Sequence, residues 1–65
     1  MTDVRQLFAD LTCAIEDLHG IAVEGQAPNL SPDIQLCLLT SISAGLNSMC
    51  GLVTRLTNTV SELHP

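Results

Sequence analysis

The side chains in this sequence that could do acid–base or metal chemistry are few and scattered. The chain of 65 residues has two histidines, His19 and His64, and three cysteines, Cys13, Cys37 and Cys50. A structural zinc site needs four such ligands, commonly including a Cys-x-x-Cys pair, and no such pair is present. Neither histidine has a nucleophile or carboxylate at a spacing that indicates a catalytic dyad. We therefore predict a non-enzymatic protein without a metal or other cofactor.

The charged side chains are mostly acidic. Seven Asp and Glu residues stand against two Arg and no Lys, which gives a formal net charge of −5. Nucleic-acid binding needs clustered basic side chains to neutralise phosphates, so we exclude that class. Asp10, Asp17 and Glu24 recur every seven residues and predict an acidic strip along one flank of a helix. Such a strip is usually a solvated face, and it is also a candidate surface for a basic protein partner.

The cysteines indicate the compartment. Their odd number, without a close pair, argues against a disulfide framework and is typical of a reduced, intracellular protein. In such a protein, cysteine commonly acts as a small apolar side chain in the core, and we expect that role here. No basic segment followed by an apolar stretch opens the chain, so we predict a cytoplasmic location.

Two heptad repeats of apolar residues predict the elements that position these groups. In the second half of the chain, apolar residues at alternating spacings of three and four predict one helix with a long seam: Leu39, Ile42, Leu46, Met49, Val53, Leu56, Val60 and Leu63. The first half has the same alternation, and Phe8 and Ile15 add a second apolar edge beside its seam. A stripe this wide contacts more than one neighbouring helix.

Capping signals mark the helix boundaries. Ser31-Pro32-Asp33 combines a serine N-cap with a proline at the first helical position, so the second helix is expected to start there. For the first helix, we predict Thr2 as the N-cap, with Asp3 in the first turn. We expect Gly25 to end it in the left-handed conformation.

These signals predict an all-α fold, a two-helix antiparallel hairpin in a single domain. The expected elements are a helix over about 3–24, a turn over about 25–31 and a helix over about 32–63. The pattern leaves open whether the first helix stops at Gly20 or near Glu24.

Self-association is expected from the small size of the chain. A chain of this length buries only about 60% of the surface that its unfolded form exposes. If the hairpin folds about Pro28, the end of the longer helix, with Leu56, Val60 and Leu63, extends roughly 15 Å beyond the shorter one. We therefore predict a homodimer that forms a four-helix bundle. Both a tetramer and either relative orientation of the two hairpins are compatible with the pattern.

A membrane span is the main alternative for the second helix. Residues 34–54 carry no charge and are numerous enough to cross a bilayer. Polar residues such as Thr40, Asn47 and Thr54, however, recur opposite the seam, which is typical of a two-faced soluble helix. We therefore predict that the chain does not span a membrane.

Two glycines inside the second helix are expected to differ in role. Each lowers helix stability by about 1 kcal/mol relative to alanine. Gly45 lies beside the seam, where it predicts the close approach of another helix. Gly51 lies at an exposed position, where it is predicted to be simply tolerated.

The remaining sequence features suggest a function through protein contacts. Apolar residues near the turn predict an exposed cap that could bind a partner: Leu30, Ile34, Leu36 and Cys37. The first hypothesis is a regulatory or adaptor protein that uses this tip or the acidic strip. The alternative is a structural homo-oligomerisation module or a subunit of a larger complex. A weaker alternative is a small-molecule binder with a bundle cavity lined by Phe8, Met49 and Cys50.

Overall fold

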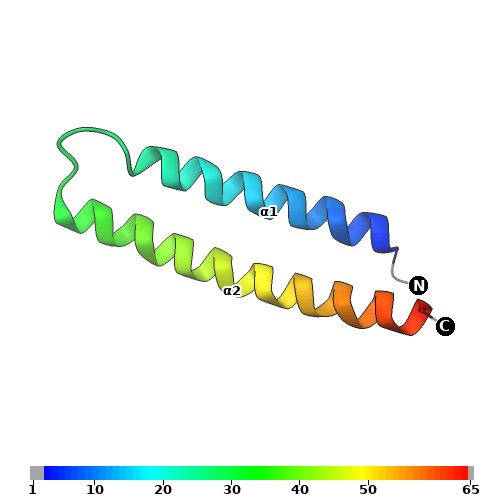
Figure 1. Cartoon of the computed structure of the whole chain (residues 1–65). Helices are drawn as coiled ribbons and strands as arrows, with labels where there is room; N and C mark the ends of the chain where they lie inside the picture. Colours follow the sequence, from blue (N-terminus) through cyan, green and yellow to red (C-terminus); the bar gives the residue numbers. More distant parts are fainter. Residues whose placement is uncertain (1–2, 65) are drawn as a thin grey trace.

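Two long helices lie side by side and antiparallel in the computed structural model, which describes residues 3–64 (Figure 1). Helix α1 spans Val4–Glu24 and helix α2 spans Pro32–Leu63. The Cα trace extends over 53 × 16 × 15 Å, so the hairpin is a rod. The start of α1 and the end of α2 lie at one end of the rod, which we call the termini end, and the connection lies at the other, the tip. The expected packing of two helices against each other is confirmed.

The start of α2 has the predicted caps. Ser31 has an extended backbone, and its Oγ accepts a hydrogen bond from the backbone N–H of Ile34 at 3.3 Å. Pro32 occupies the first helical position, where a missing N–H leaves no hydrogen bond unmade. Asp33 adds a negative charge in the first turn, which the helix dipole stabilises.

The cap of α1 differs from the prediction. Asp3 is itself the N-cap, with extended backbone, and its Oδ1 accepts a hydrogen bond from the backbone N–H of Arg5 at 2.9 Å. Its expected place in the first turn is therefore wrong. Aspartate caps as well as serine or threonine because its carboxylate accepts from an otherwise unpaired N–H group of the first turn. Thr2, the predicted cap, lies outside the described residues.

The connection reverses direction at a residue other than the predicted one. Gly25 has φ −65° and ψ −14°, so the expected left-handed glycine is wrong. Its N–H donates to the carbonyl of Ile21 at 3.1 Å, which prolongs the helical hydrogen bonding past the last residue of α1. The left-handed residue is Asn29, with φ 65°. Asparagine tolerates this conformation better than most residues, and it follows Pro28, where the helical path has already ended.

The contact between the helices, which we call the inner seam, is a line of buried and half-buried residues. In α1 it follows the predicted heptad line from Val4 to Ile21. In α2 it is rotated toward Leu38 and away from Leu39, and it consists of Leu38, Ile42, Gly45, Met49, Leu52, Leu56 and Thr59. Among the described residues only Leu7 and Leu56 are buried, with 3% and 5% of their surface exposed. The hairpin alone therefore has almost no core.

Gly45 lies where the two helices approach each other closely. A Cβ atom placed on Gly45 would come 2.6 Å from Cδ2 of Leu18 in α1, whereas one on Gly51 would meet no atom within 4 Å. The predicted close approach at Gly45 is confirmed, and the approaching helix is α1 of the same chain. This contact also sets the register, because it places Leu18 and Gly45 at the same height along the rod.

The predicted overhang of α2 is wrong in its position. Leu56 is buried, and Val60 lines a groove together with Phe8, so α1 reaches nearly to the end of α2. The connection between Glu24 and Pro32 accounts for this difference. Because it extends beyond the end of α1, the first turns of α2 lie past α1 at the tip, and the last turns of α2 lie beside the start of α1. From the Leu18–Gly45 register, α1 covers about residues 39–59 of α2. About two turns at the tip and one turn at the termini end are left uncovered.

Candidate functional site

One side of the hairpin is a continuous apolar surface. It consists of two lines of exposed side chains, each with a spacing of seven residues, which together we call the apolar face: Phe8, Ile15 and Ala22 of α1 and Leu39, Leu46, Val53 and Val60 of α2. A spacing of seven keeps residues on one side of a helix over several turns. Each line lies beside the inner seam, so the face runs along most of the rod.

Two shallow grooves show that both lines belong to the same side of the molecule. The groove near the termini end is lined by Phe8 and Leu11 of α1 and by Val53, Leu56, Thr57, Val60 and Ser61 of α2. The groove near the tip is lined by Ile21, Ala22, Gly25, Gln35, Leu38, Leu39 and Ile42. Each groove is lined by residues of both the inner seam and the apolar face.

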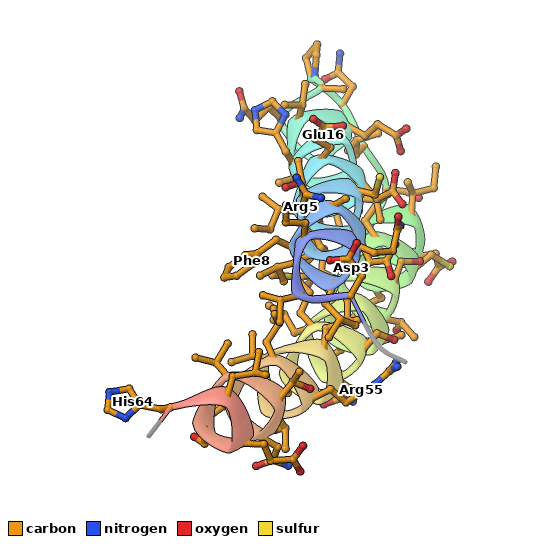
Figure 2. The ribbon with its side chains drawn as sticks, turned by 90° about the vertical axis from the view of Figure 1, so that its right-hand side faces the viewer. Asp3, Arg5, Phe8, Glu16, Arg55 and His64 are labelled. Carbon is orange, nitrogen blue, oxygen red and sulfur yellow. The ribbon has the colours of Figure 1, made fainter. Side chains whose placement is uncertain are left out.

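The opposite side of the hairpin is polar. In α1, acidic residues recur every seven positions on the far side of the inner seam, and we call them the acidic flank: Asp3, Asp10, Asp17 and Glu24. The corresponding line of α2 is polar after its first member and consists of Ile34, Ser41, Ser48, Arg55 and Glu62. Figure 2, which looks down the rod from the termini end, shows that the two sides are separate. Phe8 points to one side, whereas Asp3 and Arg55 lie on the other. No charged residue belongs to the apolar face.

The structure divides the residues predicted for self-association into two groups. Ile42, Met49 and Leu56 belong to the inner seam and are covered by α1 of the same chain. The other predicted residues are exposed: Phe8, Ile15, Leu39, Leu46, Val53, Val60 and Leu63. The predicted line of α2 residues therefore combined two surfaces: its members alternate between the apolar face and the inner seam. The pattern missed the inner-seam residues Leu38 and Leu52. Each is apolar and lies seven residues from Gly45, which was the available signal.

The residues predicted for partner binding lie at the tip and on the acidic flank. Ile34, Leu36 and Cys37 are exposed in the first two turns of α2, whereas Leu30 is half-buried. Leu36 lies next to the line of Leu39 and therefore borders the apolar face, with 61% of its surface exposed. Asp10, Asp17 and Glu24 are exposed, and Oδ1 of Asp10 accepts a hydrogen bond from Nε2 of Gln6 at 2.9 Å. Of the acidic flank, Glu24, the last residue of α1, lies at the tip, whereas Asp10 and Asp17 lie farther along the rod.

The cysteines do not have the role that the sequence suggested. Cys13, Cys37 and Cys50 are all exposed, so the prediction that they fill the core is wrong. Each cysteine lies on a side of its helix that is turned away from the other helix of the hairpin, so none of them belongs to the inner seam. Over residues 3–64, no group of three or more His, Cys, Asp or Glu side chains is arranged to hold a metal ion.

Helix α2 is long and apolar enough to cross a membrane, judged by length and composition. The most apolar 18-residue window within Pro32–Leu63 has a mean hydropathy of 1.6, and none of it is buried in the hairpin. The exposed residues on the side of α2 farthest from α1 are nevertheless polar: Thr40, Asn47 and Thr54. The apolar character is therefore concentrated on the inner seam and the apolar face.

Comparisons with known proteins add no identity: no family model, curated protein or solved structure matches this chain. The functional conclusions therefore depend on the apolar face and on the charge distribution around it.

Proposed function

We propose that this chain is a non-enzymatic, cytoplasmic protein–protein interaction module that works as a homodimer. In this dimer, two hairpins pack apolar face against apolar face and form a four-helix bundle. The observation that carries the proposal is the continuous apolar face on a hairpin with only Leu7 and Leu56 buried among its described residues. A second hairpin supplies a complementary apolar surface of the same length.

The exposed area of the single chain supports this proposal. The hairpin exposes 5051 Å². A compact monomer of the same mass, 6.9 kDa, is expected to expose about 4,000 Å². The excess of about 1,000 Å² is slightly more than the roughly 800 Å² that each partner buries in a stable protein interface. An interface of ordinary size would therefore bring each chain close to the exposed area of a compact protein.

The charge distribution supports the same contact. The acidic flank and Arg55 lie on the side away from the apolar face, whereas Arg5, three residues before Phe8, lies at its edge. Two faces can therefore meet without burying a charge at their centre. Burying an unpaired charge is far less favourable than burying an apolar side chain. The chain carries a net charge of −5, which would oppose association through its polar side.

The oligomeric state tests the proposal. In light scattering on a sizing column, we expect a helical species of about 14 kDa, twice the chain mass of 6.9 kDa. On dilution, loss of the dimer and loss of helical circular dichroism should occur together, because the single hairpin has little core. A folded species of chain mass at every concentration would contradict the proposal. So would recovery of the protein only from a detergent-solubilised membrane fraction.

A second candidate function is an adaptor that binds another protein through the tip. The observation that favours it is the position of Val23 and Ile34, which are exposed near the connection but lie off the apolar face. A dimer formed through the apolar face would leave both side chains in solvent. This role is compatible with the homodimer and adds a partner to it.

Substitution at the tip tests the adaptor role. We expect Ile34→Asp to abolish capture of a stoichiometric partner while leaving the dimer mass unchanged. A matched variant, Asp10→Lys with Asp17→Lys, tests the acidic flank in the same way. If both variants capture the partner as well as the unmodified chain does, neither surface is its binding site.

A further inference from the structure

We infer that the two hairpins of the dimer pack in opposite directions, so that the tip of one lies over the termini end of the other. The two-fold axis of this dimer is perpendicular to the rod and passes through the middle of the interface. It places α1 against α1 of the partner subunit and α2 against α2 of the partner subunit. This inference depends on the proposed homodimer and specifies how its two copies are arranged.

The two lines of the apolar face have nearly the same midpoint. The line of α2, from Leu39 to Val60, has its midpoint between Leu46 and Val53. The midpoint of the α1 line is Ile15, which the Leu18–Gly45 register places beside Ser48. These midpoints differ by only about 2 Å along the rod at 1.5 Å per residue. A single two-fold axis can therefore pass close to the midpoints of both lines.

The uncovered ends of α2 provide the strongest support. The side chains of Leu36 and Leu63 have 61% and 71% of their surface exposed, the highest values among the large apolar residues. Both lie beyond the part of α2 that α1 covers. When α2 packs antiparallel on its copy about the midpoint between Leu46 and Val53, Leu36 lies at the same height along the rod as Leu63 of the partner subunit. Leu39 lies opposite Val60 of the partner subunit in the same way.

The opposite arrangement, tip over tip, leaves these leucines exposed. A two-fold axis along the rod would place α1 of one chain on α2 of the other at unchanged height. Because α1 covers only about residues 39–59 of α2, it would reach neither Leu36 nor Leu63 in either chain. At about 25 cal/mol per Å², the apolar area of these leucines favours the arrangement that buries them.

Side-chain sizes along α1 are also complementary in the tip-over-termini arrangement. Phe8, the largest side chain of the apolar face, approaches Ala22 of the partner subunit, which is the smallest. Ile15 meets Ile15 of the partner subunit near the axis. Large side chains facing small ones interdigitate without voids. The acidic flank lies on the other side of α1, so the two copies of α1 do not face each other with carboxylates.

Distances between spin labels distinguish the two arrangements. The chain supplies the labelling sites, because Cys13, Cys37 and Cys50 are all exposed. With Cys13→Ala and Cys50→Ala, one label is attached at Cys37, about 13 residues from the midpoint of the α2 contact. At 1.5 Å per residue, the two labels should then lie about 40 Å apart along the rod. A distance below about 30 Å would overturn the inferred arrangement, because tip-over-tip packing places both labels at one height.

A second labelled variant separates failure of the arrangement from failure of the dimer. With Cys37→Ala and Cys50→Ala, the label at Cys13 lies near the middle of the rod and should give a distance below about 30 Å in either arrangement. A short distance at Cys13 with a long one at Cys37 supports the inference. Short distances at both sites refute it and keep the dimer. No measurable distance at either site, with a chain mass of one copy, refutes the dimer itself.

Discussion

Leu46→Asp is expected to abolish the dimer and, with it, most of the helical structure. Leu46 is about half exposed in the single hairpin, so a carboxylate there would be well solvated in a monomer. In the face-to-face dimer, two such carboxylates would be buried close to the two-fold axis without a cationic partner. We expect the dissociation constant of the dimer to rise at least about 100-fold, or about 3 kcal/mol.

The neighbouring residue provides the matched control. Asn47→Asp adds the same charge one position along α2, on the exposed side farthest from α1. We expect this variant to remain a dimer with unchanged helical circular dichroism. Sedimentation equilibrium of both variants over a dilution series is the measurement. Equal dimer masses for the two variants would show that Leu46 is not at an interface.

Gly45→Leu is expected to destabilise the hairpin by about 2–3 kcal/mol, because the inner seam has no room for a side chain there. Even a Cβ atom at this position would lie 2.6 Å from Cδ2 of Leu18. The better helix propensity of leucine offsets only about 1 kcal/mol of this loss. Urea denaturation followed by circular dichroism at one fixed protein concentration measures the change in free energy of unfolding.

Gly51→Leu makes the same substitution where the helix has open space. A Cβ atom at Gly51 meets no atom within 4 Å, so only the gain in helix propensity remains. We expect this variant to be more stable by about 0.5–1 kcal/mol. If both leucine variants unfolded at the same urea concentration, the close approach of α1 at Gly45 would be contradicted.

The helices themselves followed from local chemistry in the sequence. Ser31 and Pro32 determine the start of α2 through contacts within one turn, and the heptad spacing of apolar residues determines its length. The connection was harder to predict, because Gly25 and Asn29 can both adopt the left-handed conformation. Gly25 donates a helical hydrogen bond to Ile21 and stays right-handed, so the left-handed residue of the connection is Asn29.

The assignment of apolar residues to the two contacts could not be read from spacing alone. Ile42, Met49 and Leu56 combine equally well with Leu38 and Leu52 or with Leu39 and Val53, and both combinations alternate three and four. Gly45 resolves the choice, because α1 approaches α2 closely there and the inner seam therefore includes Leu38. The apolar residues of both contacts were therefore predicted from their heptad spacing, but the separation of the apolar face from the inner seam required the packed hairpin.

The near absence of a core within one chain has a consequence for how the protein persists in a cell. In the proposed dimer, folding and pairing become a single bimolecular reaction whose extent depends on abundance. Newly made chains that have not met a sister chain are open to proteases, because their helices have few protecting contacts. The protein would then have a threshold concentration. Chains expressed below this concentration are degraded, and chains expressed above it accumulate.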